Sequence, residues 1–283
     1  MKKIVRAILT ACLGLSCIAA KAQDLIVISS PNLHEDDSVL VFIPRQLQET
    51  CSEGNACGET GQTAPALFLL HGWSGCFRDW SNKCDLQQVA DQSGFLIICP
   101  DGFYDSWYVN ADDPAKRQWR TFFDQELYPQ MKERYALDPE RTFITGLSMG
   151  GHGAINLFLD DPSRFRAAGS MSGVLDLSWE GGRLGLKELI GPLSPENSRY
   201  ADESAVNRLS RAKDCGKLML ISCGYSDSLF GATRRFCERC KEESIPYIEI
   251  DSPGTHSWVY WNYALRLHLW YFSRIVNGEN LGF

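Results

Sequence analysis

Residues 146–150 read Gly-Leu-Ser-Met-Gly, a G-x-S-x-G motif that lies between two segments of different character. The apolar run 142–145 before it is typical of a buried strand, and the pattern from Gly151 onward is helical. A turn this sharp leaves no room for side chains two positions before and after the serine, and glycine meets that demand. The motif therefore predicts a strand, a tight turn and a helix, with the Ser148 hydroxyl raised clear of a sheet.

Short apolar runs recur along the chain, and helical patterns lie between them. The runs are residues 67–70, 95–98, 142–145, 167–171, 218–221 and 247–250. Their continuous hydrophobicity favours parallel strands that helices cover on both faces, while residues 25–29 and 39–43 predict an antiparallel start to the sheet. We therefore expect an α/β-hydrolase fold. Ligands of such a sheet bind at the carboxyl ends of its strands.

The pattern weakens between Asp176 and Asp214, where Gly181, Gly182, Pro192 and Pro195 interrupt short helical pieces at 184–189 and 201–210. None of these pieces could bury a core of its own. We interpret the segment as a small partial cap above the site, within a single domain that spans residues 23–283.

The N-terminus has the three parts of a secretory signal peptide. A basic start at Lys2 and Lys3 precedes the apolar stretch 7–20, and Ala20-Lys21-Ala22 matches an A-x-A cleavage site. We expect export to the periplasm or the outside, with a mature start at Gln23. The alternatives are a membrane anchor, for which the stretch is shorter than the roughly 20 residues of a spanning helix, and lipidation at Cys12 or Cys17. We expect no membrane span in the mature protein.

Charge and cysteine content narrow the function further. A net charge of −7 offers no electrostatic footprint for nucleic acid. Export permits disulfides, and Cys51 with Cys57 and Cys76 with Cys84 are candidate pairs. Cys99 and Cys223 fall in strand-like runs and are expected as buried thiols. The pair Cys237 and Cys240 lies in a charged helical segment with no matching second pair, so we expect neither a metal nor another cofactor.

A serine hydroxyl needs a general base, and His256 is the best candidate among five histidines. It lies in the loop after the last predicted strand, which is the chain order of this kind of site. Asp227 follows the penultimate strand and is the expected acid, with Asp176 and Asp251 as rivals. The backbone N–H groups of Met149 and Trp73 are the expected oxyanion donors, with Gly72 as the alternative to Trp73.

Several segments together resemble the esterase D family of α/β hydrolases. They are residues 68–72, Pro100-Asp101-Gly102 with residues 106–108, residues 145–154, residues 169–173 and residues 254–258. This family includes S-formylglutathione hydrolases, feruloyl and acetylxylan esterases, tributyrin esterases and mycolyltransferases. The resemblance covers about residues 38–272. It implies a Ser148, Asp227 and His256 triad and a serine esterase that forms an acyl-enzyme.

Export favours environmental esters over a cytosolic glutathione thioester. Aromatic residues crowd the loops expected around the site, and we expect Trp107, Tyr108 and Trp258 to contact substrate, although core packing is the alternative for each. The expected substrate is a small or carbohydrate-linked ester with an acyl or feruloyl group. A broad short-chain esterase, an acyltransferase and a non-catalytic carbohydrate-binding protein on the same fold are the other hypotheses.

Overall fold

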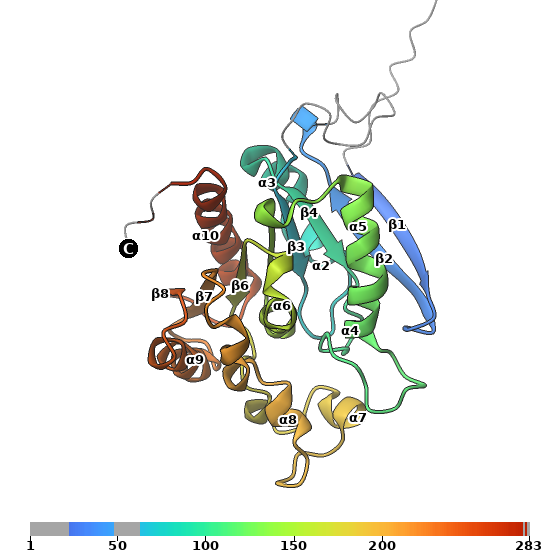
Figure 1. The fold of residues 1–283 in the computed structure, drawn as a ribbon, viewed down its shortest axis with the longest axis vertical. Coiled ribbons are helices and arrows are strands. Elements are labelled where there is room, and N and C mark those ends of the chain that lie inside the picture. The colour runs from blue at the N-terminus through green and yellow to red at the C-terminus, as the bar shows by residue number, and fades with distance from the viewer. Residues whose placement is uncertain (1–22, 48–62, 280, 282–283) are drawn as a thin grey trace, which may run out of the picture.

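The computed structural model describes residues 23–47, 63–279 and 281. The predicted signal peptide and the pair Cys51 and Cys57 lie outside these residues. The described residues form one eight-stranded sheet (Figure 1). In spatial order its strands are β1 (Gln23–Ser30), β2 (Glu35–Phe42), β4 (Leu96–Pro100), β3 (Ala66–Leu70), β5 (Thr142–Gly146), β6 (Ala167–Met171), β7 (Leu218–Gly224) and β8 (Tyr247–Ser252).

Only the β1–β2 and β2–β4 pairings of this sheet are antiparallel; strands β4 to β8 run parallel. The structure thereby confirms the expected α/β-hydrolase fold and its antiparallel start. Parallel strands bring their carboxyl ends to one edge, so the loops after β3, β5, β7 and β8 meet there.

Helices cover both faces of the sheet. One face carries α3 (Leu86–Ser93) and α10 (Trp258–Val276), and the other carries α5 (Tyr128–Tyr135), α6 (Met149–Asp160) and α9 (Phe230–Glu242). Among the described residues no helix combines the length and the apolarity needed to cross a membrane.

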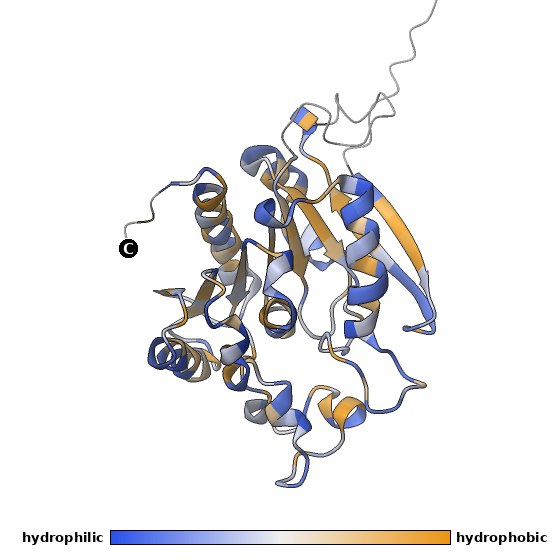
Figure 2. Ribbon diagram, in the orientation of Figure 1, coloured by the Kyte–Doolittle hydropathy of each residue, from blue (hydrophilic) through white to orange (hydrophobic). Residues whose placement is uncertain are grey.

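Alternation along the strands divides the core into two layers. In β3, Phe68 and Leu70 pack toward α5 and α6, whereas Leu67 and Leu69 pack toward α3 and α10. Successive strand residues point to opposite faces, and both faces are buried here, which explains the uninterrupted apolar runs. Figure 2 shows the central strands as hydrophobic and the outward side of α5 as hydrophilic.

The predicted partial cap follows β6 and carries α7 (Leu186–Ile190) and α8 (Arg199–Asp202) (Figure 1). The single helical piece expected over 201–210 is wrong, because α8 ends at Asp202 and two short 3-10 turns follow it, Ala205–Asn207 and Leu209–Ala212. The Ser204 hydroxyl contacts the Tyr200 carbonyl at 2.6 Å and the Leu177 amide at 2.8 Å. These side-chain hydrogen bonds compete with the helical pattern and end α8 early.

The pairing considered for Cys76 and Cys84 is wrong, since both are free thiols in the structure. The short helix α2 (Asp79–Lys83) lies between them. The two cysteines are eight positions apart across this helix, and at about 1.5 Å per helical residue their Cα atoms lie farther apart than the roughly 7 Å that a disulfide spans. Cys99 and Cys223 are buried as expected, and Cys237 and Cys240 lie buried along α9.

Candidate active site

Ser148 occupies the turn between β5 and α6, where its backbone adopts φ 51° and ψ −116°. A positive φ is strained for a residue with a side chain. The same turn brings the neighbouring glycines so close to other backbone atoms that a side chain at either position would clash. A Cβ on Gly146 would lie 2.5 Å from the Gly150 backbone carbon, and a Cβ on Gly150 would lie 2.5 Å from the His71 carbonyl oxygen. The turn therefore holds the start of α6 directly against the end of β3.

His256 lies between Ser148 and Asp227. Its Nε2 is 3.0 Å from Ser148 Oγ, and its Nδ1 is 3.1 and 3.0 Å from the two carboxylate oxygens of Asp227. The carboxylate accepts a hydrogen bond from Nδ1–H, which leaves Nε2 free to accept the proton of the serine hydroxyl. The structure thus brings together the three residues predicted as nucleophile, base and acid.

The Asp227 carboxylate is shielded from solvent and well supplied with donors. Its side chain is 0% exposed, and it accepts a hydrogen bond of 2.9 Å from the Leu229 amide. Burial raises the pKa of Asp227, but the hydrogen bonds from His256 and Leu229 outweigh burial and hold that pKa below its usual value. The residue is therefore ionised at neutral pH and can fix the orientation of the imidazole.

Backbone contacts hold the acid loop against the histidine loop. The Tyr225 amide donates to the Ser252 carbonyl and the Ser226 amide to the Gly254 carbonyl, each at 2.9 Å. A Cβ on Gly224 would lie 2.4 Å from the Gly254 carbonyl carbon. The separation of acid and base is thus set by main-chain packing between the loops after β7 and β8.

Two backbone N–H groups beside Ser148 have no partner among the described residues, those of Met149 and Trp73. Met149 is the first residue of α6, where the helix dipole favours negative charge. Trp73 follows Gly72, and a Cβ on Gly72 would lie 3.6 Å from Ser148 Cβ. Both donors predicted for an oxyanion hole therefore belong to segments that flank the nucleophile.

His71 fixes the peptide group that carries the Trp73 donor. Its Nε2 accepts from the Gly102 amide at 2.7 Å, which leaves the ring proton on Nδ1, 2.8 Å from the Gly72 carbonyl. In a trans peptide the carbonyl and the following N–H point in opposite directions. Turning the Gly72 carbonyl toward His71 therefore turns the Trp73 N–H away from it.

The family model Esterase, described as "Putative esterase", matches residues 52–271. The chain belongs to this esterase family. The match covers most of the chain, and it confirms the resemblance to the esterase D family. The protein is a serine esterase.

One sequence relative supports the same family, and two solved structures share its fold. The esterase is 27% identical to S-formylglutathione hydrolase of Mus musculus over 247 residues, which is 77% of this chain and 86% of the relative. It is similar in fold to the fluorophosphonate-binding serine hydrolase FphF of Staphylococcus aureus, with a TM-score of 0.78, 22% identity and coverage of 89% and 98%. A ferulic acid esterase matches with a TM-score of 0.74, 23% identity and coverage of 90% and 98%.

Trp107 and Tyr108 do not lie where substrate contact would require them. They are 1% and 0% exposed. Trp107 Nε1 donates to the Leu184 carbonyl at 2.8 Å, and Tyr108 OH donates to the His71 carbonyl at 2.8 Å. The predicted substrate contacts are therefore wrong for this pair, because both rings are buried in the core, where they support the cap and the oxyanion loop.

Trp258 is partly buried within an aromatic group that supports the base. Its ring packs edge-on against Trp80 at 5.2 Å and Trp261 at 5.3 Å, and the Trp261 ring in turn lies 4.9 Å from the imidazole of His256. These contacts restrict the His256 ring from the side of α10. A substrate contact for Trp258 stays a prediction.

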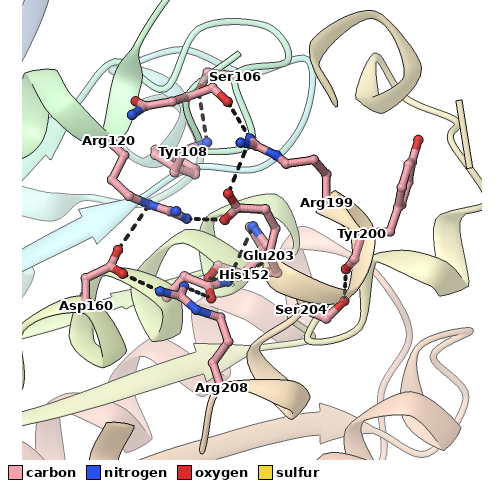
Figure 3. A network of polar contacts seen from close by, with 12 residues as sticks. Ser106, Tyr108, Arg120, His152, Asp160, Arg199, Tyr200, Glu203, Ser204 and Arg208 are labelled. Carbon is pink, nitrogen blue, oxygen red and sulfur yellow. Dashed lines mark hydrogen bonds and ion pairs between the residues drawn. The ribbon is translucent and has the colours of Figure 1, made fainter. Parts of the chain in front are cut away.

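A buried ionic network joins the cap of the esterase to its body (Figure 3). Glu203, next to α8, accepts from Arg120 at 2.6 Å and from Arg199 at 3.3 Å. Asp160, at the end of α6, binds Arg120 at 3.0 Å and also binds Arg208. With Arg211, which also binds Asp160 at 3.0 Å, the two carboxylates connect four arginines across the junction.

Sequence reasoning did not find this network. Arg120 and Glu203 are 83 residues apart, and neither lies in a motif. The one local signal is the concentration of arginines at 199, 208 and 211 within the weakly patterned cap. Only the fold brings Arg120 of α4 (Trp119–Phe122) and Asp160 of α6 within reach of the charged residues of the cap.

Proposed function

We propose that the esterase is an exported carboxylic-ester hydrolase that acts through Ser148, His256 and Asp227 on acyl or feruloyl esters of carbohydrates. The observation that carries the proposal is the continuous line of contacts from Asp227 through His256 to Ser148, at 3.0 Å for each link, beside two unpaired N–H donors. This is the arrangement that a serine nucleophile needs for acyl transfer.

In the proposed reaction, His256 Nε2 takes the proton of Ser148 as Oγ attacks the ester carbonyl carbon. The N–H groups of Met149 and Trp73 hold the resulting oxyanion. The intermediate collapses, the alcohol leaves with the proton from His256, and the acyl group stays on Oγ. Water then attacks the acyl carbon while His256 takes its proton, and the acid is released as Ser148 regains its hydrogen.

Hydrolysis requires that water can reach the base beside the acyl-enzyme. The His256 side chain is 34% exposed, so water can reach the position from which the acyl-enzyme is attacked. A carbohydrate-linked substrate is supported by the fold shared with a ferulic acid esterase and by the N-terminal signal pattern, which fits a protein that meets external esters.

The test compares the mature protein with its Ser148→Ala variant on p-nitrophenyl acetate, methyl ferulate and acetylated xylan. We expect serine-dependent turnover, with kcat/KM for ferulate or xylan above that for the simple acetate. Equal or better turnover of the acetate would instead identify a broad short-chain esterase. Turnover that Ser148→Ala leaves unchanged would contradict the proposed nucleophile.

Export is tested separately by expression of the full chain in a Gram-negative host. We expect to find the protein in the periplasm or the medium, with an intact mass that matches a chain beginning at Gln23. A full-length mass in the cytosol would reject the exported part of the proposal and leave the catalytic part standing.

A further inference from the structure

A histidine that the proposed chemistry does not use lies in the middle of the core. His268 of α10 is 0% exposed, although its helix packs on the sheet mainly through apolar residues. Its Nδ1 is 2.9 Å from Thr145 Oγ1 on β5, and its Nε2 is 3.0 Å from Ser222 Oγ on β7. One imidazole thus connects a helix to two strands of the sheet.

The strand between β5 and β7 makes room for this ring. A Cβ on Gly169 of β6 would lie 2.5 Å from His268 Nδ1 and 2.7 Å from Thr145 Oγ1. A side chain at this position would displace the imidazole from both hydroxyls. The glycine and the histidine therefore form a matched pair, which is unlike an incidental polar residue in an apolar layer.

One assignment of donors and acceptors satisfies the hydrogen bonds of His268, Thr145 and Ser222. Burial lowers the pKa of His268 to about 3, so the ring is neutral and carries one proton. Ser222 Oγ also lies 3.4 Å from the Ser170 carbonyl, which can only accept. The assignment that satisfies these groups together has the serine hydroxyl donate to that carbonyl and accept from His268 Nε2–H, while Nδ1 accepts from the Thr145 hydroxyl. Every polar atom of the chain then has a partner.

The three anchored segments are those that carry the proposed triad. Thr145 precedes Ser148 by three residues, Ser222 precedes Asp227 by five, and α10 begins two residues after His256. Hydrogen bonds are directional, whereas apolar contacts tolerate sliding, so a fully satisfied polar group in a core selects one arrangement of the elements around it.

We propose that His268 is a positioning residue, which sets the alignment of β5, β7 and α10 and thereby the distances within the Ser148, His256 and Asp227 group. The proposal rests on the proposed function for the roles of those three residues. A misplacement of about 1 Å can lower a rate by on the order of 100-fold, so small shifts of α10 have a measurable effect.

The decisive variant is His268→Phe, which keeps a planar ring and removes both hydrogen bonds. Phe272→Leu is the matched control, because Phe272 packs 4.7 Å from Phe143 and edge-on at 6.0 Å from the His268 ring. This variant perturbs the packing of the same face of α10 but keeps the imidazole and both hydroxyls that it contacts. For each variant, kcat and KM on p-nitrophenyl acetate, the rate of Ser148 labelling by a fluorophosphonate and the thermal midpoint are measured. All rates are taken well below the midpoint.

We expect His268→Phe to lower kcat and the labelling rate by about tenfold or more, with KM within about twofold of wild type. Phe272→Leu is expected to lower the midpoint and leave both rates within about twofold. His268→Gln, which can keep an N–H near Ser222 Oγ, is expected to recover part of the loss. Wild-type rates in a folded His268→Phe protein would overturn the proposal, as would equal rate losses in both variants.

If His268→Phe does not accumulate in folded form, Thr145→Val and Thr145→Ser carry the same test. Valine removes the hydroxyl at nearly constant volume, and serine retains it. A tenfold loss of labelling rate in Thr145→Val but not in Thr145→Ser supports the positioning role. Equal labelling rates in the two variants overturn it. The fluorophosphonate reports on the nucleophile without an ester substrate. Normal labelling of the wild-type protein without any ester turnover would therefore contradict the proposed function but not the positioning role of His268.

Discussion

The Asp227 carboxylate lies 3.0 Å from His256 Nδ1, although the two residues belong to different loops and are 29 positions apart. We predict that Asp227→Asn lowers kcat by about 10,000-fold with little change in KM, because an amide favours the wrong imidazole tautomer. Steady-state kinetics on p-nitrophenyl acetate measure the effect. Asp176→Asn is the control, since Asp176 caps the turn at Ser178. A larger loss in the control would reassign the acid.

The approach of Gly72 to the nucleophile gives a second prediction. A Cβ on Gly72 would lie 2.5 Å from Leu147 Cδ1, so Gly72→Ala must displace either the Leu147 side chain next to the nucleophile or the loop that carries the Trp73 N–H. We expect a loss of kcat of about 100-fold, as for removal of one oxyanion donor. Gly231→Ala is the control, because nothing lies within 4 Å of its Cβ position in α9. The control is expected to keep full activity. If the Gly72→Ala enzyme were as active as this control, the Trp73 N–H would not be part of the oxyanion hole.

The ionic network predicts that loss of a buried charge lowers the free energy of unfolding more than loss of an exposed one. Glu203 is 7% exposed and binds two arginines, so Glu203→Gln leaves Arg120 and Arg199 without that charge. Loss of one partner of a buried ion pair costs about 3 kcal/mol of unfolding free energy. Arg211→Gln removes a 54% exposed partner of Asp160 and is expected to cost less than about 1 kcal/mol. Urea unfolding compares the two, and similar losses would show that the Glu203 pairs contribute no more than a surface contact.

Acid sensitivity follows from two buried histidines. Burial lowers the pKa of His152 and of His268 to about 3, against about 6.5 in an unfolded chain. Between these values the unfolded chain binds more protons, so this stability is present above pH 6.5 and is lost as the pH falls toward 3. Each histidine contributes a slope of about 1.4 kcal/mol per pH unit.

Urea unfolding at pH 7, 6 and 5 measures that slope. His152→Gln is expected to remove half of the histidine contribution whatever its effect on absolute stability. An unchanged slope between pH 6 and 5 in this variant would show that His152 does not stay neutral in the native state.

Local chemistry determined the features that the sequence alone could predict. The strands β3, β4, β5, β6 and β7 are confirmed because burial on both faces demands continuous apolar runs. The edge strand β8 is confirmed too, although most of its residues are only partly buried. The turn at Ser148 was readable because a strained backbone and two close approaches restrict Gly146 and Gly150 to glycine. The order of strands then predicted which loops, and so which histidine and aspartate, would meet the serine.

Tertiary packing decided what those loops do with their side chains. Trp107 and Tyr108 lie in a loop at the expected edge of the sheet, yet both side chains are buried and hydrogen-bonded inside the core. A local pattern of aromatic residues does not distinguish that direction from exposure to substrate. The ion pairs of Glu203 and the contacts of His268 join residues far apart in the chain. Such contacts depend on which surfaces the fold brings together. The sequence therefore determined which chemical groups are available to this esterase, and only the packed structure determined how those groups are aligned.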